Sequence, residues 1–134
     1  MKAIFIFCFL FFLLACNAGK TFNKAEDAQD AGRQFIRASL DGDYEKARFY
    51  LLGDSVNLLL ISKWQQGFDR MDRDTRQQYR EASILPINIR TINDSVTIYS
   101  FTNSFRRDTT TVRIVRVQGE WLVDLKEILN DKHH

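Results

Sequence analysis

Residues 84–102 of the chain, ILPINIRTINDSVTIYSFT, decide the fold class, because apolar side chains recur there at alternate positions. Successive side chains of a β-strand point to opposite faces, so this period predicts two strands, 84–92 and 96–102. Asn93-Asp94 lies between them and is a typical turn sequence. The stretch is therefore predicted to form an antiparallel hairpin.

Two further strands are predicted towards the C-terminus. Residues 109–117 are rich in β-branched side chains, and residues 121–125 alternate again after the turn signal Gln118-Gly119. Because the turns between consecutive strands are short, the strands are expected to form an antiparallel meander. The C-terminal half is thus predicted to be a sheet of three to four strands.

The chain before the hairpin is predicted to be helical. Apolar residues recur at helical steps in segments 25–40, 44–52, 55–68 and 73–82, with aspartate and glycine between the segments as capping and stop signals. The third segment is expected to pack through one face of its helix. That face carries Val56, Leu59, Leu60, Lys63 and Trp64. Helices followed by a sheet predict the α+β class.

The N-terminus carries a different signal. Lys2 is followed by an uncharged apolar run, residues 3–15. A helix of that length spans about 20 Å, whereas a bilayer core is about 30 Å thick. The run is therefore too short for a comfortable membrane span, and residues 1–15 are predicted to be a signal peptide.

The end of this run, Leu13-Leu14-Ala15-Cys16, resembles the lipobox of bacterial lipoproteins. The resemblance implies cleavage between Ala15 and Cys16 and attachment of acyl chains to the Cys16 thiol. Two or more chains hold a protein stably on a membrane, so the expected location is the bacterial envelope, facing the periplasm. The alternatives are plain secretion after a cut near Ala18 and an uncleaved anchor.

Composition narrows the function classes of the remaining chain. Without the signal peptide, 18 lysine and arginine residues balance 17 aspartate and glutamate residues, so no strong field favours nucleic acid as a partner. Cys8 leaves with the signal peptide, and Cys16 alone cannot form an internal disulfide. Residues 16–24 are expected to be a lipidated tether, 25–129 a single domain and 130–134 a tail.

Three segments together resemble the nuclear-transport-factor-2-like (cystatin-like) superfamily, in particular small bacterial lipoproteins with an uncharacterised domain of that shape. The segments are DGDYEKA at 41–47, MDRDTRQQY at 71–79 and GEWLVD at 119–124. The resemblance implies N-terminal helices packed on a curved sheet that leaves a cone-shaped pocket. Some relatives are isomerases or dehydratases, while others bind ligands or dimerise, so the fold alone implies no function.

Few residues are candidates for catalysis. His133 and His134 are the only histidines and lie at the C-terminus, and no nucleophile pair, zinc cluster or glycine-rich phosphate loop is present in the sequence. No catalytic residue, metal or cofactor is therefore assigned. Asp124 would be a candidate general base if its strand face lined a pocket. The alternative is an exposed residue or a local structural hydrogen bond.

The aromatic residues Trp64, Tyr99, Phe101 and Trp121 are, with Asp124, the candidates for a pocket lining, although such side chains more often form a core.

Basic residues at helical steps have two interpretations, a stripe for anionic head groups or a solvated face with ion pairs. They are Arg70, Arg73, Arg76 and Arg80.

These patterns favour a lipid-anchored envelope protein whose domain binds a hydrophobic ligand or an envelope protein without catalysis. One alternative is a small isomerase- or dehydratase-like enzyme that acts on a hydrophobic substrate in the pocket. The other is a structural homodimer that pairs through the open face of the sheet.

Overall fold

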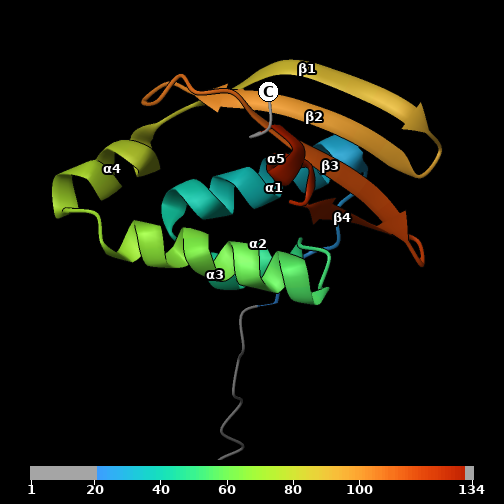
Figure 1. Cartoon of the computed structure of the whole chain (residues 1–134), viewed down its shortest axis with the longest axis horizontal. Coiled ribbons are helices and arrows are strands. Elements are labelled where there is room, and N and C mark those ends of the chain that lie inside the picture. The colour runs from blue at the N-terminus through green and yellow to red at the C-terminus, as the bar shows by residue number, and fades with distance from the viewer. Residues whose placement is uncertain (1–20, 132–134) are drawn as a thin grey trace, which may run out of the picture.

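The computed structural model describes residues 21–131 and confirms the α+β class (Figure 1). Four helices come first: α1 (Ala28–Asp41), α2 (Tyr44–Phe49), α3 (Ser55–Asp69) and α4 (Arg73–Glu81). Four strands follow: β1 (Ile84–Asn93), β2 (Val96–Asn103), β3 (Thr110–Val117) and β4 (Glu120–Asp124). A short helix, α5 (Glu127–Asp131), ends the described chain and was not predicted.

The strands form one antiparallel meander in the order β1-β2-β3-β4, as the short turns predict. Figure 1 shows the sheet curving over α1, with α3 on the far side of that helix. The outer edge of β4 is occupied by the segment after α2, because Leu52 N donates to Val123 O and Val123 N donates to Tyr50 O. Among the described residues, the outer edge of β1 has no such partner.

Aspartates start the four N-terminal helices by capping their free N–H groups. In each case the side chain accepts a hydrogen bond from the backbone N–H three residues further on. The capping residues are Asp27, Asp43, Asp54 and Asp72. The expected stop of α1 at Gly42 is also confirmed, because this residue has a φ of 74°. A side chain there would meet the Phe68 ring, since an added Cβ would lie 2.4 Å from Cε1.

The core lies between α1 and the sheet. Ala31, Phe35 and Ala38 on α1 are buried, as their helical spacing predicts. They face a sheet surface of buried side chains that includes Tyr99, Val112, Ile114 and Val123. Apolar side chains removed from water at this interface provide the main stabilisation of the domain.

The predicted packing side of α3 is wrong in part. Its buried residues are Asn57, Ile61 and Phe68, with Leu60 and Trp64 partly buried. Val56 and Leu59, which were expected to pack, are 40% and 56% exposed. The helix is rotated from the expected orientation because a polar side chain, Asn57, occupies an inward position that apolar periodicity does not mark.

Asn57 is fully buried, and hydrogen bonds use each polar group of its amide. Its Nδ2 donates to Asp124 Oδ1 at 3.1 Å and to Asp54 Oδ2 at 3.3 Å, and its Oδ1 accepts from Leu125 N at 2.8 Å. Lys126 adds a salt bridge to Asp54 and lies 3.5 Å from Asp124. These bonds join the first turn of α3 to the end of β4.

Part of the expected tether contacts the folded domain. The Phe22 ring lies 5.5 Å from that of Phe49, Tyr50 Oη donates to Asn23 O at 2.6 Å, and Lys24 pairs with Glu120 at 2.8 Å. At the other end, α5 includes residues 130 and 131, which were expected to belong to the tail.

The predicted signal peptide, the cleavage site at Ala15 and Cys16, and both histidines lie outside the described residues. Within residues 21–131, no helix is long and apolar enough to cross a membrane.

Replacing Asn57 with alanine should lower the free energy of unfolding by about 2–4 kcal/mol, because Leu125 N and the buried Asp124 carboxylate lose hydrogen-bond partners. Urea unfolding followed by circular dichroism measures this change. Gln66→Ala, at an exposed position of the same helix, is the control and should change stability by less than about 0.5 kcal/mol. Equal effects of the two substitutions would contradict the role given to Asn57.

Candidate functional site

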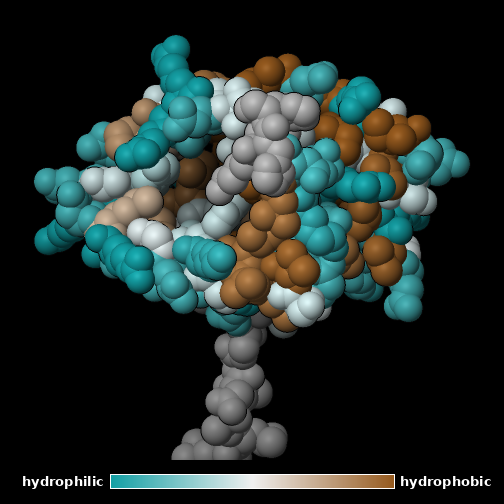
Figure 2. Space-filling model, in the orientation of Figure 1, coloured by the Kyte–Doolittle hydropathy of each residue, from teal (hydrophilic) through white to brown (hydrophobic). Residues whose placement is uncertain are grey.

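A cavity of about 290 Å³ opens where α1, α3 and the region of α4 approach one end of β2 and β3. Figure 2 shows a hollow in the left half of the molecule with apolar atoms inside it. The volume is near the lower end of the range for small-molecule pockets, roughly 300–1,000 Å³. The lining residues are Ile36, Ser39, Leu40, Tyr44, Trp64, Gly67, Phe68, Met71, Tyr79, Phe101, Asn103 and Thr110.

Aromatic rings form much of the wall. The Trp64 ring lies 5.9 Å from that of Phe35, and the Tyr44 ring meets Phe68 edge-on at 6.0 Å. Such contacts hold the rings in fixed orientations and present flat apolar faces to the cavity. The lining residues include no carboxylate, histidine, lysine or arginine. The described wall therefore suits an uncharged, mainly apolar molecule.

Tyr44 provides a polar group inside this apolar wall. Its side chain is largely buried and is part of the cavity wall. Burial is the main cause that raises the pKa of Tyr44 to about 12, so the phenol is neutral at physiological pH. A neutral hydroxyl in this place can donate a hydrogen bond to an acceptor on a bound molecule.

Arg37 of α1 fixes the α4 side of the cavity. Its Nη1 donates to Ala82 O at 2.7 Å, and its Nη2 donates to Arg80 O at 3.0 Å and Tyr79 O at 3.3 Å. Asp41 accepts from the same guanidinium at 2.8 Å. A cation at the last carbonyls of a helix is favourable because the backbone dipole places negative charge there. Arg37 thus holds Tyr79 at the cavity, although α4 itself contains no buried residue.

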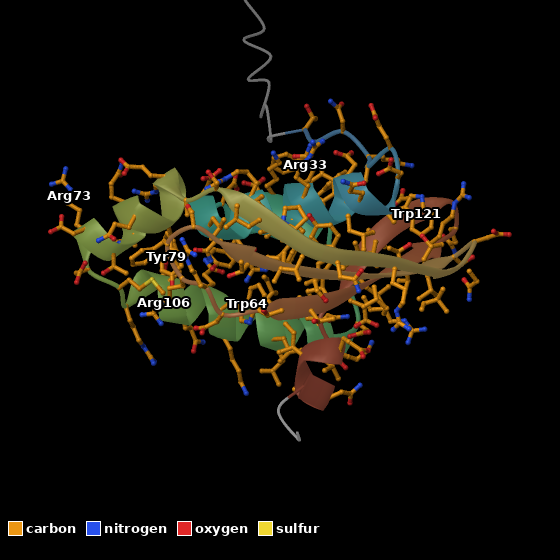
Figure 3. The ribbon with its side chains drawn as sticks, turned by 90° about the horizontal axis from the view of Figure 1, so that it is seen from above. Arg33, Trp64, Arg73, Tyr79, Arg106 and Trp121 are labelled. Carbon is orange, nitrogen blue, oxygen red and sulfur yellow. The ribbon has the colours of Figure 1, made fainter. Side chains whose placement is uncertain are left out.

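None of the four arginines of the predicted basic stripe lines the cavity, since Arg70 ends α3 and the other three belong to α4. Arg80 lies over the Phe68 ring at 6.0 Å and donates to Asp41 O at 3.4 Å. Figure 3 shows Arg73 at the far end of α4, directed away from the molecule. The neighbouring Asp72 has a lowered pKa, first because Thr75 N donates to it and further because Arg76 lies nearby.

The structure brings together two of the five predicted pocket residues. Trp64 and Phe101 line the cavity. Tyr99 lies in the core beside Phe101, with 5.9 Å between ring centres. Trp121 lies at the opposite end of the molecule in Figure 3, where the Arg116 guanidinium covers its ring at 5.7 Å.

Asp124 lies away from this cavity and has the structural hydrogen bonds that were the alternative to a catalytic role. It accepts from Asn57 Nδ2 and from Lys126 N, each at 3.1 Å. Among the described residues, no group of three or more histidine, cysteine, aspartate or glutamate side chains is arranged to hold a metal ion.

Sequence reasoning did not assign Tyr44, Met71 or Tyr79 to the pocket. Tyr44 shares one face of the helical segment 44–52 with Ala47 and Leu51, but that spacing does not distinguish a core position from a cavity wall. A signal was available for Tyr79, because it is the only aromatic residue in the strongly polar segment 72–83. A single aromatic side chain on a strongly polar helix indicates a contact between that helix and the rest of the domain.

A scan of the chain against protein-family models finds no match, and a search of curated proteins finds no significant match. The nuclear-transport-factor-2-like resemblance therefore stays a prediction, and the assignment of a function depends on the geometry of the site.

Proposed function

We propose that this protein is a lipid-anchored component of the bacterial envelope that binds a small, uncharged, mainly apolar ligand in the cavity beside α3. The single observation that carries the binding role is the cavity itself, a mainly apolar, largely aromatic space that the Tyr44 side chain helps to line. The neutral phenol of Tyr44 can donate a hydrogen bond to an acceptor on a ligand in this cavity.

The lining narrows the chemistry of the ligand. A charged group would lose its hydration in the cavity without an opposite charge among the lining residues, which is strongly unfavourable. An aromatic or alicyclic body suits the flat faces of Trp64 and Tyr79, and a carbonyl, ether or hydroxyl oxygen suits Tyr44. The ligand class that follows is a neutral, mainly apolar ring compound with a hydrogen-bond acceptor for Tyr44.

The envelope location is supported by the apolar run and by Cys16. Each buried methylene contributes about 0.8 kcal/mol to membrane binding, so the two or three chains of a bacterial lipoprotein prevent dissociation. The acylated Cys16 would keep the binding domain at the membrane surface. Binding in the cavity and attachment to the membrane are separate properties, and they are tested separately below.

Replacing Gly67 with leucine should abolish ligand binding without unfolding the protein. No atom lies within 4 Å of a Cβ added at Gly67, so the new side chain has room in the cavity, and leucine favours a helix by roughly 0.5–1 kcal/mol over glycine. The measurement uses prodan, a neutral fluorescent naphthyl ketone, with chain 16–134 carrying Cys16→Ser to avoid a lipid background.

Two further variants make this test specific. Tyr44→Phe should weaken prodan binding by about tenfold, because one hydrogen bond of roughly 1.4 kcal/mol is lost. The same variant should bind the naphthylamine probe N-phenyl-1-naphthylamine as well as the unsubstituted protein does. Gln66→Leu adds the same side chain as Gly67→Leu, next to the cavity lining, and should bind prodan normally. Unchanged prodan binding by Gly67→Leu would exclude this cavity as the binding site.

Substitution of Cys16 tests the anchor. The native product should begin at an acylated Cys16 and fractionate with membranes, whereas Cys16→Ser should leave the membrane fraction because no thiol remains to accept the acyl chains. Mass spectrometry of the N-terminus and fractionation measure the two effects. A Cys16→Ser protein that stays with the membranes, or an unacylated native N-terminus, would contradict the proposal.

The exposed edge strand favours a second candidate function, a structural homodimer. Leu85, Ile87, Ile89 and Ile92 of β1 are 38–55% exposed, and an uncovered edge strand is able to pair with another chain. Ile87→Lys should convert such a dimer to a monomer in analytical ultracentrifugation, because it places a charge in the apolar contact. Thr109→Lys, at an exposed position between β2 and β3, is the control. A monomeric native protein would exclude this candidate.

A further inference from the structure

The attachment point of the domain restricts which face it can turn to the membrane. Phe22, Asn23 and Lys24 are held against α2 and β4 by the contacts described above. Only residues 17–21 separate this fixed segment from Cys16. Even fully extended, that stretch reaches about 20 Å. If Cys16 is acylated, as proposed above, the surface around Phe22 must therefore stay close to the bilayer.

This surface has the composition of a membrane-interface contact. Phe49 is 38% exposed, and Trp121 and Leu122 are partly exposed around a shallow depression that the Lys24–Glu120 ion pair also lines, while the partly exposed Phe22 lies beside Phe49. Arg116 lies over the Trp121 ring and is exposed. Aromatic side chains favour the head-group region, and cations are attracted to anionic lipid. We call this surface the anchor face; it comprises Phe22, Lys24, Phe49, Arg116, Trp121 and Leu122.

We propose that the anchor face docks on the lipid surface, so that the domain is oriented by its own side chains as well as tethered by Cys16. The proposal rests on the acylation proposed above, because the aromatic patch is too small to retain the protein on a membrane alone. The acyl chains supply the attachment, and the aromatic rings enter the head-group region on the side where the chain emerges.

Docking in this way places the ligand cavity on the side away from the membrane. Thr110, at the start of β3, lines the cavity, whereas Arg116, near the end of the same strand, belongs to the anchor face. Six residues of strand span about 20 Å. Figure 3 likewise shows Trp121 near one end of the molecule, Tyr79 and Arg106 towards the other end, and Trp64 nearer the middle. The cavity would then take its ligand from the aqueous compartment rather than from within the bilayer.

The two tryptophans of the chain allow a direct test, because one lies on the anchor face and the other lines the cavity. The full-length acylated protein is reconstituted in vesicles of phosphatidylethanolamine and phosphatidylglycerol, with and without brominated phosphatidylcholine as a quencher. Trp64→Phe leaves Trp121 as the only reporter, and Trp121→Phe leaves Trp64. Brominated lipid should quench Trp121 at least twofold and should not change Trp64.

A matched pair of substitutions in the Trp64→Phe protein tests the contact itself. Phe49→Asp should reduce the quenching of Trp121 by at least half, because a carboxylate at this place opposes contact with anionic lipid. Ile87→Asp, at an exposed apolar residue of β1, should leave the quenching unchanged. Circular dichroism of each variant establishes that it is folded before the comparison is made.

The outcomes separate the docking proposal from the anchor on which it rests. An acylated, membrane-bound protein in which Trp121 is not quenched overturns docking and leaves the anchor intact. Quenching of Trp64 without Trp121 overturns the orientation, because the cavity would then face the bilayer. A protein without acylation by mass spectrometry removes the anchor itself and, with it, the basis for docking. Quenching of Trp121 alone, reduced by Phe49→Asp, supports the proposal.

Discussion

The buried amide of Asn57 sets the position of α3, and the cavity depends on that position. Its bonds to Asp124 and Leu125 fix the first turn of the helix against the end of the sheet. At the other end of the helix, Phe68 packs on the bare backbone of Gly42 and meets the Tyr44 ring. The helix is therefore held near both ends, and its central and C-terminal residues form one wall of an incompletely filled space beside α1.

A polar side chain provides this constraint better than an apolar one would. Apolar contacts are non-directional, so a leucine at position 57 would allow α3 to rotate or slide at small cost. The amide has fixed donor and acceptor directions, and leaving any of them unpaired in the interior is unfavourable. The same directional bonds keep Val56 and Leu59 on the outside, which is the reason that the apolar pattern of the helix predicts its inner face poorly.

The remaining cavity wall is held by few interactions. No residue of α4 is buried, and Arg37 supports the helix through its last carbonyl groups, assisted by the edge-on contact of Tyr79 with Phe105 at 4.9 Å. Segments with little buried surface open at a lower free-energy cost than the core. The rigid parts of the site, Trp64 and Phe101, thus belong to well-packed elements, while Met71 and Tyr79 belong to the part best able to adjust to a ligand.

Local patterns in the sequence were sufficient to determine the α+β class, the order of helices and strands and the caps between the helices, although the cap of α1 at Asp27 was not among them. Helix and strand periods and capping side chains act between residues that are near one another in the chain, so they are visible without a structure. The burial of Ala31 and Phe35 on α1 follows from the same rule. The short Cys16 motif, equally local, is the source of the proposed location.

Only the tertiary structure decided which of the aromatic residues share a cavity. The sequence made Trp64 and Trp121 equal candidates for the pocket lining. In the structure Trp64 lines the cavity, whereas Trp121 lies under Arg116 at the opposite end of the domain. Tyr44, Tyr79 and Phe101 meet around one space because α1, α3 and the strands are packed at particular angles. Packing angles depend on contacts between residues far apart in the chain, such as Asn57 with Asp124, and no local pattern encodes them.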